Sequence, residues 1–207
     1  MTLGQITLFF LTIMAVIVIA MLVHSYLDKK RIMERLQYLK AEYKGEVLQE
    51  SLFEYPRFYS ANGGSGRRFD LFFNVVKVGR QHILYSIYSV TTSLPHSFLL
   101  IKKDDYKAIA DEARFTEENG GILSGIDPPF QGRSREPKWA EHVYQQKAVN
   151  ESIQTLDGFT SVQFGPDAIV AGKPYEETAD TDPAWVFRSV KTLEKLAQGL
   201  EQCPASI

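Results

Sequence analysis

Residues 2–23 read TLGQITLFFLTIMAVIVIAMLV and contain no ionisable side chain. An α-helix rises about 1.5 Å per residue, so about 20 apolar residues cross a hydrocarbon core roughly 30 Å thick. Backbone groups in lipid must be hydrogen-bonded within their own segment, which favours a helix. The stretch therefore predicts a membrane-spanning helix with its ends at Ile6 and Val23, and the rest of the chain is expected to be tethered by it.

Two other interpretations of this segment fit its sequence less well than an anchor. A cleaved signal peptide has a basic start, a shorter apolar core and a cleavage site between small residues. Residues 2–5 carry no basic side chain, and residues 21–31, MLVHSYLDKKR, offer no such site. A buried core helix rarely needs so long an uncharged run. We therefore expect an uncleaved signal anchor, assigned to residues 1–24.

The charges that follow the span predict its orientation. Lys and Arg near the end of a span tend to remain in the cytoplasm. The basic side chains just beyond it are Lys29, Lys30, Arg31, Arg35, Lys40 and Lys44. The other side offers only the α-amino group, so we expect a single-pass protein of a bacterial inner membrane with its main domain in the cytoplasm. Anionic headgroups are expected to contact Lys29, Lys30, Arg31 and Arg35.

Residues 25–45 are predicted to continue the helix as a juxtamembrane segment. An apolar face at helical spacing is formed by Ile32, Leu36, Leu39 and Tyr43. It favours an amphipathic helix that lies on its own domain or on lipid. The alternative is a short coiled coil through which two chains associate, although only about two heptads are present.

Residues 46–203 have the composition of one globular domain, followed by a tail at 204–207. The chain has 23 basic and 25 acidic residues, and this near balance argues against a nucleic-acid-binding surface. Its 13 Phe and 10 Tyr residues favour a real hydrophobic core. The single cysteine, Cys203, cannot form an internal disulfide, in agreement with a reducing compartment.

β-Branched and aromatic residues predict strands in this domain. They are expected at 69–78, 81–90 and 98–102, and as a hairpin at 160–164 and 168–172. Residues 46–59 are ambiguous, with a break at Pro56, and residues 122–137 are expected to be a loop.

Helices are predicted at residues 104–113 and 138–156 and after Asp182, although the polar run at 144–147 interrupts the pattern of the second. In the last helix Asp182 is the expected N-cap and Pro183 the first helical residue. Its apolar stripe consists of Val186, Val190, Leu193, Ala197 and Leu200. Strands and helices in this order predict an α+β fold with a mainly antiparallel sheet.

The sequence contains no recognisable catalytic or metal-binding motif. The histidines at 24, 82, 96 and 142 do not stand at metal-ligand spacing. The acidic residues at 176–182 lack the order of a calcium loop, and no nucleophile elbow is present. No catalytic residue, metal or cofactor is therefore predicted.

The glycine-rich stretch 60–68, SANGGSGRR, is the one motif that suggests an anion. Backbone amides of such a loop can cradle a phosphate, and Gly64, Gly66, Arg67 and Arg68 are the candidate residues. The stretch matches neither the phosphate-binding loop nor the dinucleotide fingerprint. A simple interstrand loop is the favoured interpretation.

The order of elements resembles bacterial membrane-anchored domains of unknown function. The resemblance rests on the N-terminal anchor, Gly66-Arg67-Arg68 before a strand, Leu94-Pro95 before Phe98-Leu99-Leu100, and the closing hairpin around FGPDAIV (164–170) with its terminal helix. It implies a tethered domain and brings no catalytic residue.

Three functions follow as hypotheses. The favoured one is a membrane-anchored binding or scaffold protein, an accessory or assembly component that contacts lipid and either a protein partner or a second copy through the juxtamembrane helix. The alternative is a tethered hydrolase acting on a membrane-derived or phosphate-bearing substrate, with Arg67, Arg68 and His82 near a pocket. The third is a dimeric sensor that signals through the helix.

Overall fold

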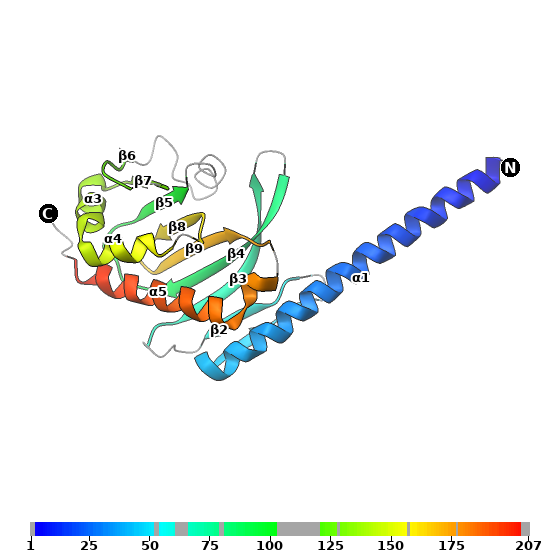
Figure 1. Cartoon of the computed structure of the whole chain (residues 1–207), viewed down its shortest axis with the longest axis horizontal. Coiled ribbons are helices and arrows are strands. Elements are labelled where there is room, and N and C mark those ends of the chain that lie inside the picture. Colours follow the sequence, from blue (N-terminus) through cyan, green and yellow to red (C-terminus); the bar gives the residue numbers. More distant parts are fainter. Residues whose placement is uncertain are drawn as a thin grey trace.

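The structure is a computed structural model that describes residues 3–51, 54–60, 66–78, 81–102, 121–127, 129–156, 158–176 and 178–203. A long helix, α1 (Leu3–Tyr43), leads into a domain built on one sheet. In Figure 1 the N-terminal part of α1 projects away from the domain and its C-terminal part lies along it. The architecture is α+β, as the sequence predicts.

Within the described residues the sheet has nine strands, and neighbouring strands are antiparallel. Their order is β1-β2-β3-β4-β9-β8-β5-β7-β6. They are β1 (Gly45–Leu48), β2 (Arg57–Ser60), β3 (Phe69–Val78), β4 (Gln81–Thr91), β5 (Phe98–Lys102), β6 (Gly121–Ile122), β7 (Phe130–Ser134), β8 (Ser161–Phe164) and β9 (Ala168–Pro174). The β8–β9 hairpin lies between β4 and β5 in the sheet, although it follows β7 in the sequence.

All five predicted strands are confirmed, as β3, β4, β5, β8 and β9. The hairpin β3–β4 is in register from Phe69 opposite Val90 to Val78 opposite Gln81. The ambiguous residues 46–59 contain β1 and β2, which flank the break at Pro56. The prediction of a loop at 122–137 is wrong in part. Residues 130–134 form β7, which pairs with β5 along its whole length and buries Phe130.

The helices of the domain are α3 (Pro137–Gln145), α4 (Lys147–Gln154), the 3₁₀ turn η2 (Thr178–Thr181) and α5 (Pro183–Glu201). The single helix predicted at 138–156 is divided at Gln146, whose ψ of 121° is extended. For α5 the prediction is confirmed: the Asp182 carboxylate accepts a hydrogen bond from the Ala184 amide at 2.9 Å. The helix expected at 104–113 lies outside the described residues.

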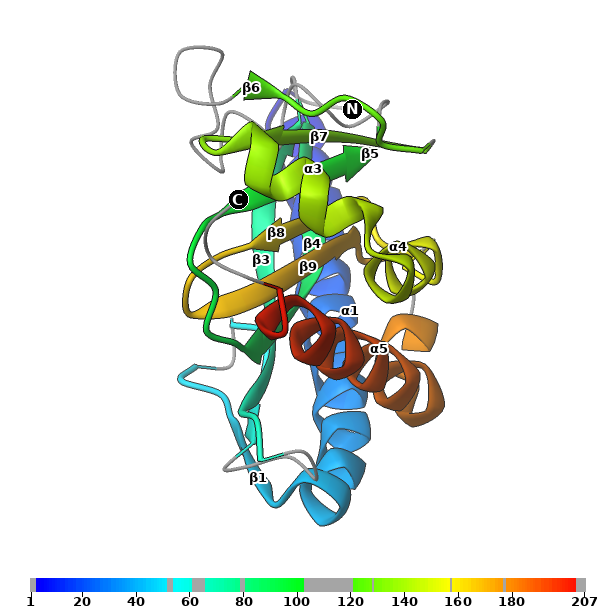
Figure 2. The same cartoon turned by 90° about the vertical axis from the view of Figure 1, so that its left-hand side faces the viewer.

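One face of the sheet carries the main core. Residues from α1, α3, α4 and α5 join the inward-facing residues of the strands in one continuous cluster, and Figure 2 shows α4, α5 and the C-terminal part of α1 on the same side of the sheet. The rings of Phe98 and Phe164, which are paired across β5 and β8, stack at 3.9 Å. Because side chains alternate along a strand, a smaller cluster lies on the opposite face. It consists of Val76, Tyr85, Leu99 and Ile101.

The end of α1 is enforced by backbone conformation. Lys44, directly after the helix, has φ of 49°, a left-handed conformation that stops an α-helix. A Cβ atom at the next residue, Gly45, would clash with the Tyr59 carbonyl oxygen. Only glycine fits this close approach, and it lets the chain turn directly from α1 into β1.

Candidate membrane-coupling site

The N-terminal part of α1 is long and apolar enough to cross a membrane. Its mean hydropathy reaches 3.0, and every side chain from residue 4 to residue 24 is exposed. The hydroxyl of Thr12 donates to the Leu8 carbonyl at 2.9 Å, so this polar group is satisfied within the helix. The predicted span ends, Ile6 and Val23, lie inside this exposed part, and no break in the helix marks either of them.

The C-terminal part of α1 is packed into the domain. Its apolar stripe is between 0% and 5% exposed and consists of Ile32, Leu36, Leu39 and Tyr43. The stripe packs in the main core, and α1 also contacts β1, β2, η2 and α5. This is the first of the arrangements expected from the sequence, a helix lying on its own domain. The surface that a coiled coil would need is covered.

Two charged residues mark the point where α1 meets the domain. The Nζ atom of Lys29 lies 5.2 Å from the centre of the Tyr55 ring, a cation–π contact. The hydroxyl of Tyr175 donates to a carboxylate oxygen of Asp28 at 3.4 Å. Lys29 is only 7% exposed, although it is within a few residues of the exposed apolar segment. The packed part of α1 thus begins at residues 28–29.

Three aromatic rings complete this contact on the domain side. Tyr55, Phe73 and Tyr175 lie with ring centroids 5.4–6.5 Å apart, in the tilted and edge-to-face arrangements that aromatic pairs favour. Burial, followed by the negative charge of Asp28, raises the pKa of both tyrosine hydroxyls above the ordinary value, so they remain protonated. We call Asp28, Lys29, Tyr55, Phe73 and Tyr175 the junction cluster.

A second polar network braces the turn that packs against α1. The carboxylate of Asp180, in η2, pairs with Lys173 at 2.5 Å and accepts a hydrogen bond from the Glu176 amide at 3.0 Å. Its carbonyl accepts a hydrogen bond from the Tyr88 hydroxyl at 2.8 Å. These contacts of Asp180 hold η2 in place, and η2 packs against α1. The acidic residues at 176–182 thus contribute to the structure of the domain. Among the described residues no group of three or more His, Cys, Asp and Glu could hold a metal ion.

The expected headgroup contacts fall into two groups. Lys30 and Arg31 are exposed, as a position among headgroups requires. Lys29 is buried against the domain, and Arg35 is half-buried. The sequence shows four basic residues close to the span, but helical geometry turns Lys29 toward the core because it lies three residues before Ile32.

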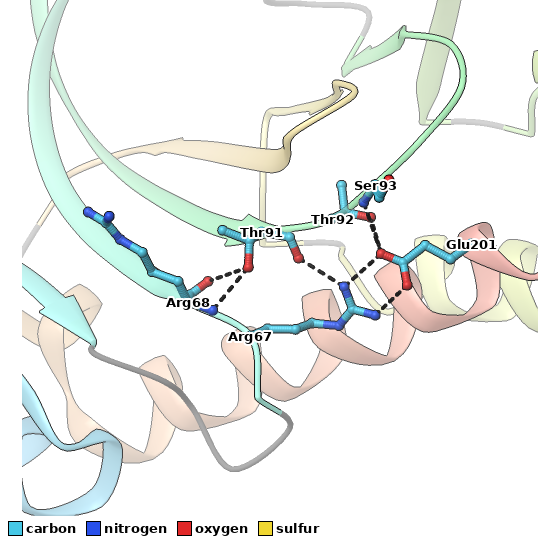
Figure 3. Close-up of polar contacts among 6 residues, drawn as sticks. All are labelled: Arg67, Arg68, Thr91, Thr92, Ser93 and Glu201. Atoms are coloured by element: carbon cyan, nitrogen blue, oxygen red, sulfur yellow. Dashed lines mark hydrogen bonds and ion pairs between the residues drawn. The ribbon is translucent and has the colours of Figure 1, made fainter.

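Arg67, one of the candidate anion-binding residues, forms a clamp inside the chain (Figure 3). Its guanidinium makes a two-point ion pair with Glu201, at the end of α5, with distances of 2.8 and 2.6 Å. The same carboxylate accepts hydrogen bonds from the Thr92 hydroxyl and the Ser93 amide, each at 2.9 Å. These donors lower the pKa of Glu201 to about 2, with Arg67 the largest cause. The clamp ties the end of α5 to the strand entry of β3 and the exit of β4.

The other residues of the glycine-rich stretch are also placed. Arg68 pairs with Asp70 at 3.0 Å and lies over the Tyr59 ring. Gly66 has φ of 80°, which glycine adopts without strain. Gly64 lies outside the described residues. Binding of an external anion therefore stays a prediction, and both arginines already have carboxylate partners in the chain.

His82 lies far from these arginines. It pairs with Lys77 near the tip of the β3–β4 hairpin, whereas Arg67 and Arg68 precede the opposite end of β3. At about 3.3 Å per residue, the strand separates them by roughly 30 Å. The hydrolase pocket that would combine Arg67, Arg68 and His82 is not formed.

A surface hollow of about 340 Å³ lies at the other end of the packed part of α1. It is formed between α1 and the start of α5, where Leu39, Tyr43 and Phe187 contribute to its walls. Tyr38 lies at this hollow and is 70% exposed, which is unusual for a large aromatic side chain. Sequence reasoning missed this feature because Tyr38 is outside the apolar stripe.

Comparison with protein families and with curated proteins gives no match. Among solved structures, the chain is similar to the mycobacterial trehalose monomycolate transport factor A, TtfA, whose crystal structure superposes with a TM-score of 0.55 at 10% sequence identity. The match covers 82% of this chain and 96% of that one. At this identity the similarity shows a shared fold.

Proposed function

We propose that the protein is a single-pass membrane protein whose α+β domain acts by binding, as an accessory component of a membrane assembly. The observation that carries the proposal is the continuity of α1. One helix joins an exposed apolar segment to a stripe buried in the domain core. The domain is thereby held at a fixed place beside the bilayer, as an assembly component requires.

The orientation belongs to the same proposal. We expect the N-terminus outside and the domain in the cytoplasm, because basic side chains follow the apolar segment and residues 2–5, before it, carry none. Lys30 and Arg31, which are exposed, carry this argument most directly. A reporter fused to the C-terminus that works only outside the cytoplasm would contradict it.

The fold supports an accessory role as well. The solved protein that shares it is described as a transport factor. We propose a protein partner in a membrane transport or assembly system, contacted through the domain. The hollow beside Tyr38 is the surface on which such a partner would dock, because exposed aromatic side chains are enriched in protein interfaces.

The test is affinity purification of the full-length protein in mild detergent, with the mass of the complex measured by light scattering. We expect a stoichiometric partner that is still captured when residues 4–23 are replaced by an unrelated apolar span of equal length. Tyr38→Ala should weaken capture, whereas Ile122→Ala, an equally exposed side chain on β6, should not. Finding neither a partner nor self-association would contradict the proposal.

Loss of the partner with the replaced span would also contradict it, since recognition would then occur within the membrane. Self-association in place of a second protein would redirect the proposal to a homo-oligomer. The stripe from Ile32 to Tyr43 could not mediate it without leaving the core, so the hollow would be the surface to examine.

A further inference from the structure

Ring contacts define how β3 runs relative to α1. Phe69, at the start of β3, packs against Tyr43 at the end of α1, with ring centroids 5.5 Å apart. Four residues later, Phe73 belongs to the junction cluster, which contacts α1 at residues 28–29. β3 therefore runs back along α1, from the C-terminal end of the helix toward its exposed apolar segment.

The hairpin formed by β3 and β4 extends beyond the junction cluster. β3 continues from Phe73 to Val78, and at about 3.3 Å per residue this adds about 17 Å. Along α1, only about 6 Å of helix separate Asp28 from residue 24, the last of the fully exposed apolar part. Figure 1 shows the hairpin rising clear of the other strands, on the side toward which the N-terminal part of α1 projects. Its tip therefore reaches the level at which α1 enters the apolar segment.

The tip has the chemistry of a lipid-contacting surface. Lys77 and His82 lie opposite each other in the register, and both are exposed. Val75, on the same face two residues before Lys77, is 51% exposed. No acidic residue occurs in the sequence between Asp70 and Asp104. A cationic side chain such as Lys77 beside an exposed apolar one is typical of segments that lie in the headgroup region of anionic bilayers.

We propose that this hairpin tip, defined by Val75, Lys77 and His82, is a second membrane contact that rests on the anionic lipid surface beside α1. The proposal depends on the anchor described under the proposed function. A spanning helix alone leaves the tilt of the domain relative to the bilayer free. A second contact with the lipid surface, away from the helix axis, restricts that tilt, so the domain keeps a defined orientation to the bilayer.

Site-directed fluorescence on the full-length protein in lipid nanodiscs tests this contact. An environment-sensitive dye is attached at Val75→Cys in a Cys203→Ser background, and quenching by headgroup-spin-labelled lipid is measured. We expect quenching at Val75 when phosphatidylglycerol is present, and much less in pure phosphatidylcholine. Ile122→Cys is the matched control, because it is an exposed apolar strand residue at the opposite edge of the sheet. It should not be quenched.

The electrostatic part is tested by adding Lys77→Gln to the labelled protein. Loss of one lysine near an anionic surface should lower the quenched population relative to the free one about fivefold. Lys138→Gln, an exposed lysine on α3, should change nothing. Unchanged quenching with Lys77→Gln, or equal quenching in neutral and anionic discs, would overturn the recognition of anionic lipid.

A dye at Leu22→Cys, in the apolar segment, separates this proposal from the anchor itself. Quenching at Leu22 without quenching at Val75 would overturn the hairpin contact and leave the anchor in place. Absence of quenching at both positions would overturn the anchor and this inference together. Thermal unfolding of each labelled protein verifies that the domain is folded.

Discussion

The two parts of α1 have the same backbone and opposite relations to their surroundings. From residue 4 to residue 24 every side chain is exposed, and the apolar residues occur all around the helix. From Ile32 to Tyr43 the apolar residues form one stripe, which is buried in the domain. A helix that is apolar on all sides requires lipid, and one with a stripe requires a protein surface.

The change from one part to the other occurs within a few residues. Lys29 is buried over the Tyr55 ring and its neighbour Lys30 is exposed. No loop or break separates the two parts. The distribution of apolar residues around the helix therefore shows where the apolar segment ends and the domain begins. The length and charge of the helix show this less clearly.

The largest expected loss of domain stability comes from a substitution in α5, the helix against which the packed part of α1 lies. Leu193→Asp places an unpaired carboxylate where the native side chain is 0% exposed. Burial of an uncompensated charge costs several kcal/mol, so the domain should unfold. Thermal denaturation of the full-length protein in detergent measures this, with the exposed Gln198→Asp as control. An unchanged melting temperature would show that the stripe of α5 is not buried.

Truncation of one leucine in each part of α1 tests the comparison itself. Leu36→Ala removes a side chain that is 0% exposed and should destabilise the domain by about 2–5 kcal/mol. Leu11→Ala removes one that is 62% exposed and should leave domain unfolding unchanged. Denaturant titrations followed by tryptophan fluorescence compare them. Similar losses in both variants would contradict the division of α1 into two parts.

The Arg67–Glu201 clamp predicts a dependence of stability on pH in the domain that the packed part of α1 joins. The pKa of Glu201 falls from 4.5 to about 2, so its contribution is complete above pH 4.5 and is lost as the pH falls toward 2. The pair is partly exposed to solvent, and screening reduces its contribution to about 1 kcal/mol. Glu201→Gln should remove this part of the acid dependence, and Arg67→Ala should remove most of it, because the hydrogen bonds from Thr92 and Ser93 remain. Parallel acid titration curves for wild type and both variants would refute the clamp.

The smallest effect distinguishes two neighbouring lysines. Lys29→Met removes the cation–π contact with Tyr55 and should cost about 0.5–1 kcal/mol of domain stability. Lys30→Met alters an exposed residue and should not affect unfolding, although it should weaken attraction to anionic lipid. Chemical unfolding and nanodisc quenching measure the two effects separately. Equal unfolding curves would place Lys29 outside the junction.

Much of the fold can be predicted from local sequence. The apolar run, the capped α5 with its stripe, the β3–β4 hairpin and the C-terminal hairpin each have a pattern of their own, and all four are present. β1 and β7 are harder because they are short and contain glycine, and they form through pairing with strands distant in sequence. The order of the strands depends on these distant pairings and is not encoded in any local pattern.

The site shows the same division. The spacing of the apolar residues identifies the buried stripe of α1, but the sequence does not show which elements the stripe packs against. The junction cluster joins residues 28–29 to Tyr55, Phe73 and Tyr175, which only the folded sheet brings together. Arg67 and Glu201 are at opposite ends of the domain sequence, so the glycine-rich stretch suggests an external anion where the fold supplies an internal carboxylate.

Rigid coupling between the apolar segment and the domain is the central claim, and a distance distribution across the junction tests it most directly. Spin labels at Leu22→Cys and Gln198→Cys, in a Cys203→Ser background, report it for the full-length protein in nanodiscs. A continuous helix packed from residue 28 predicts a single narrow distribution. A broad or multiple distribution would show a hinge between the two parts of α1 and would contradict the account.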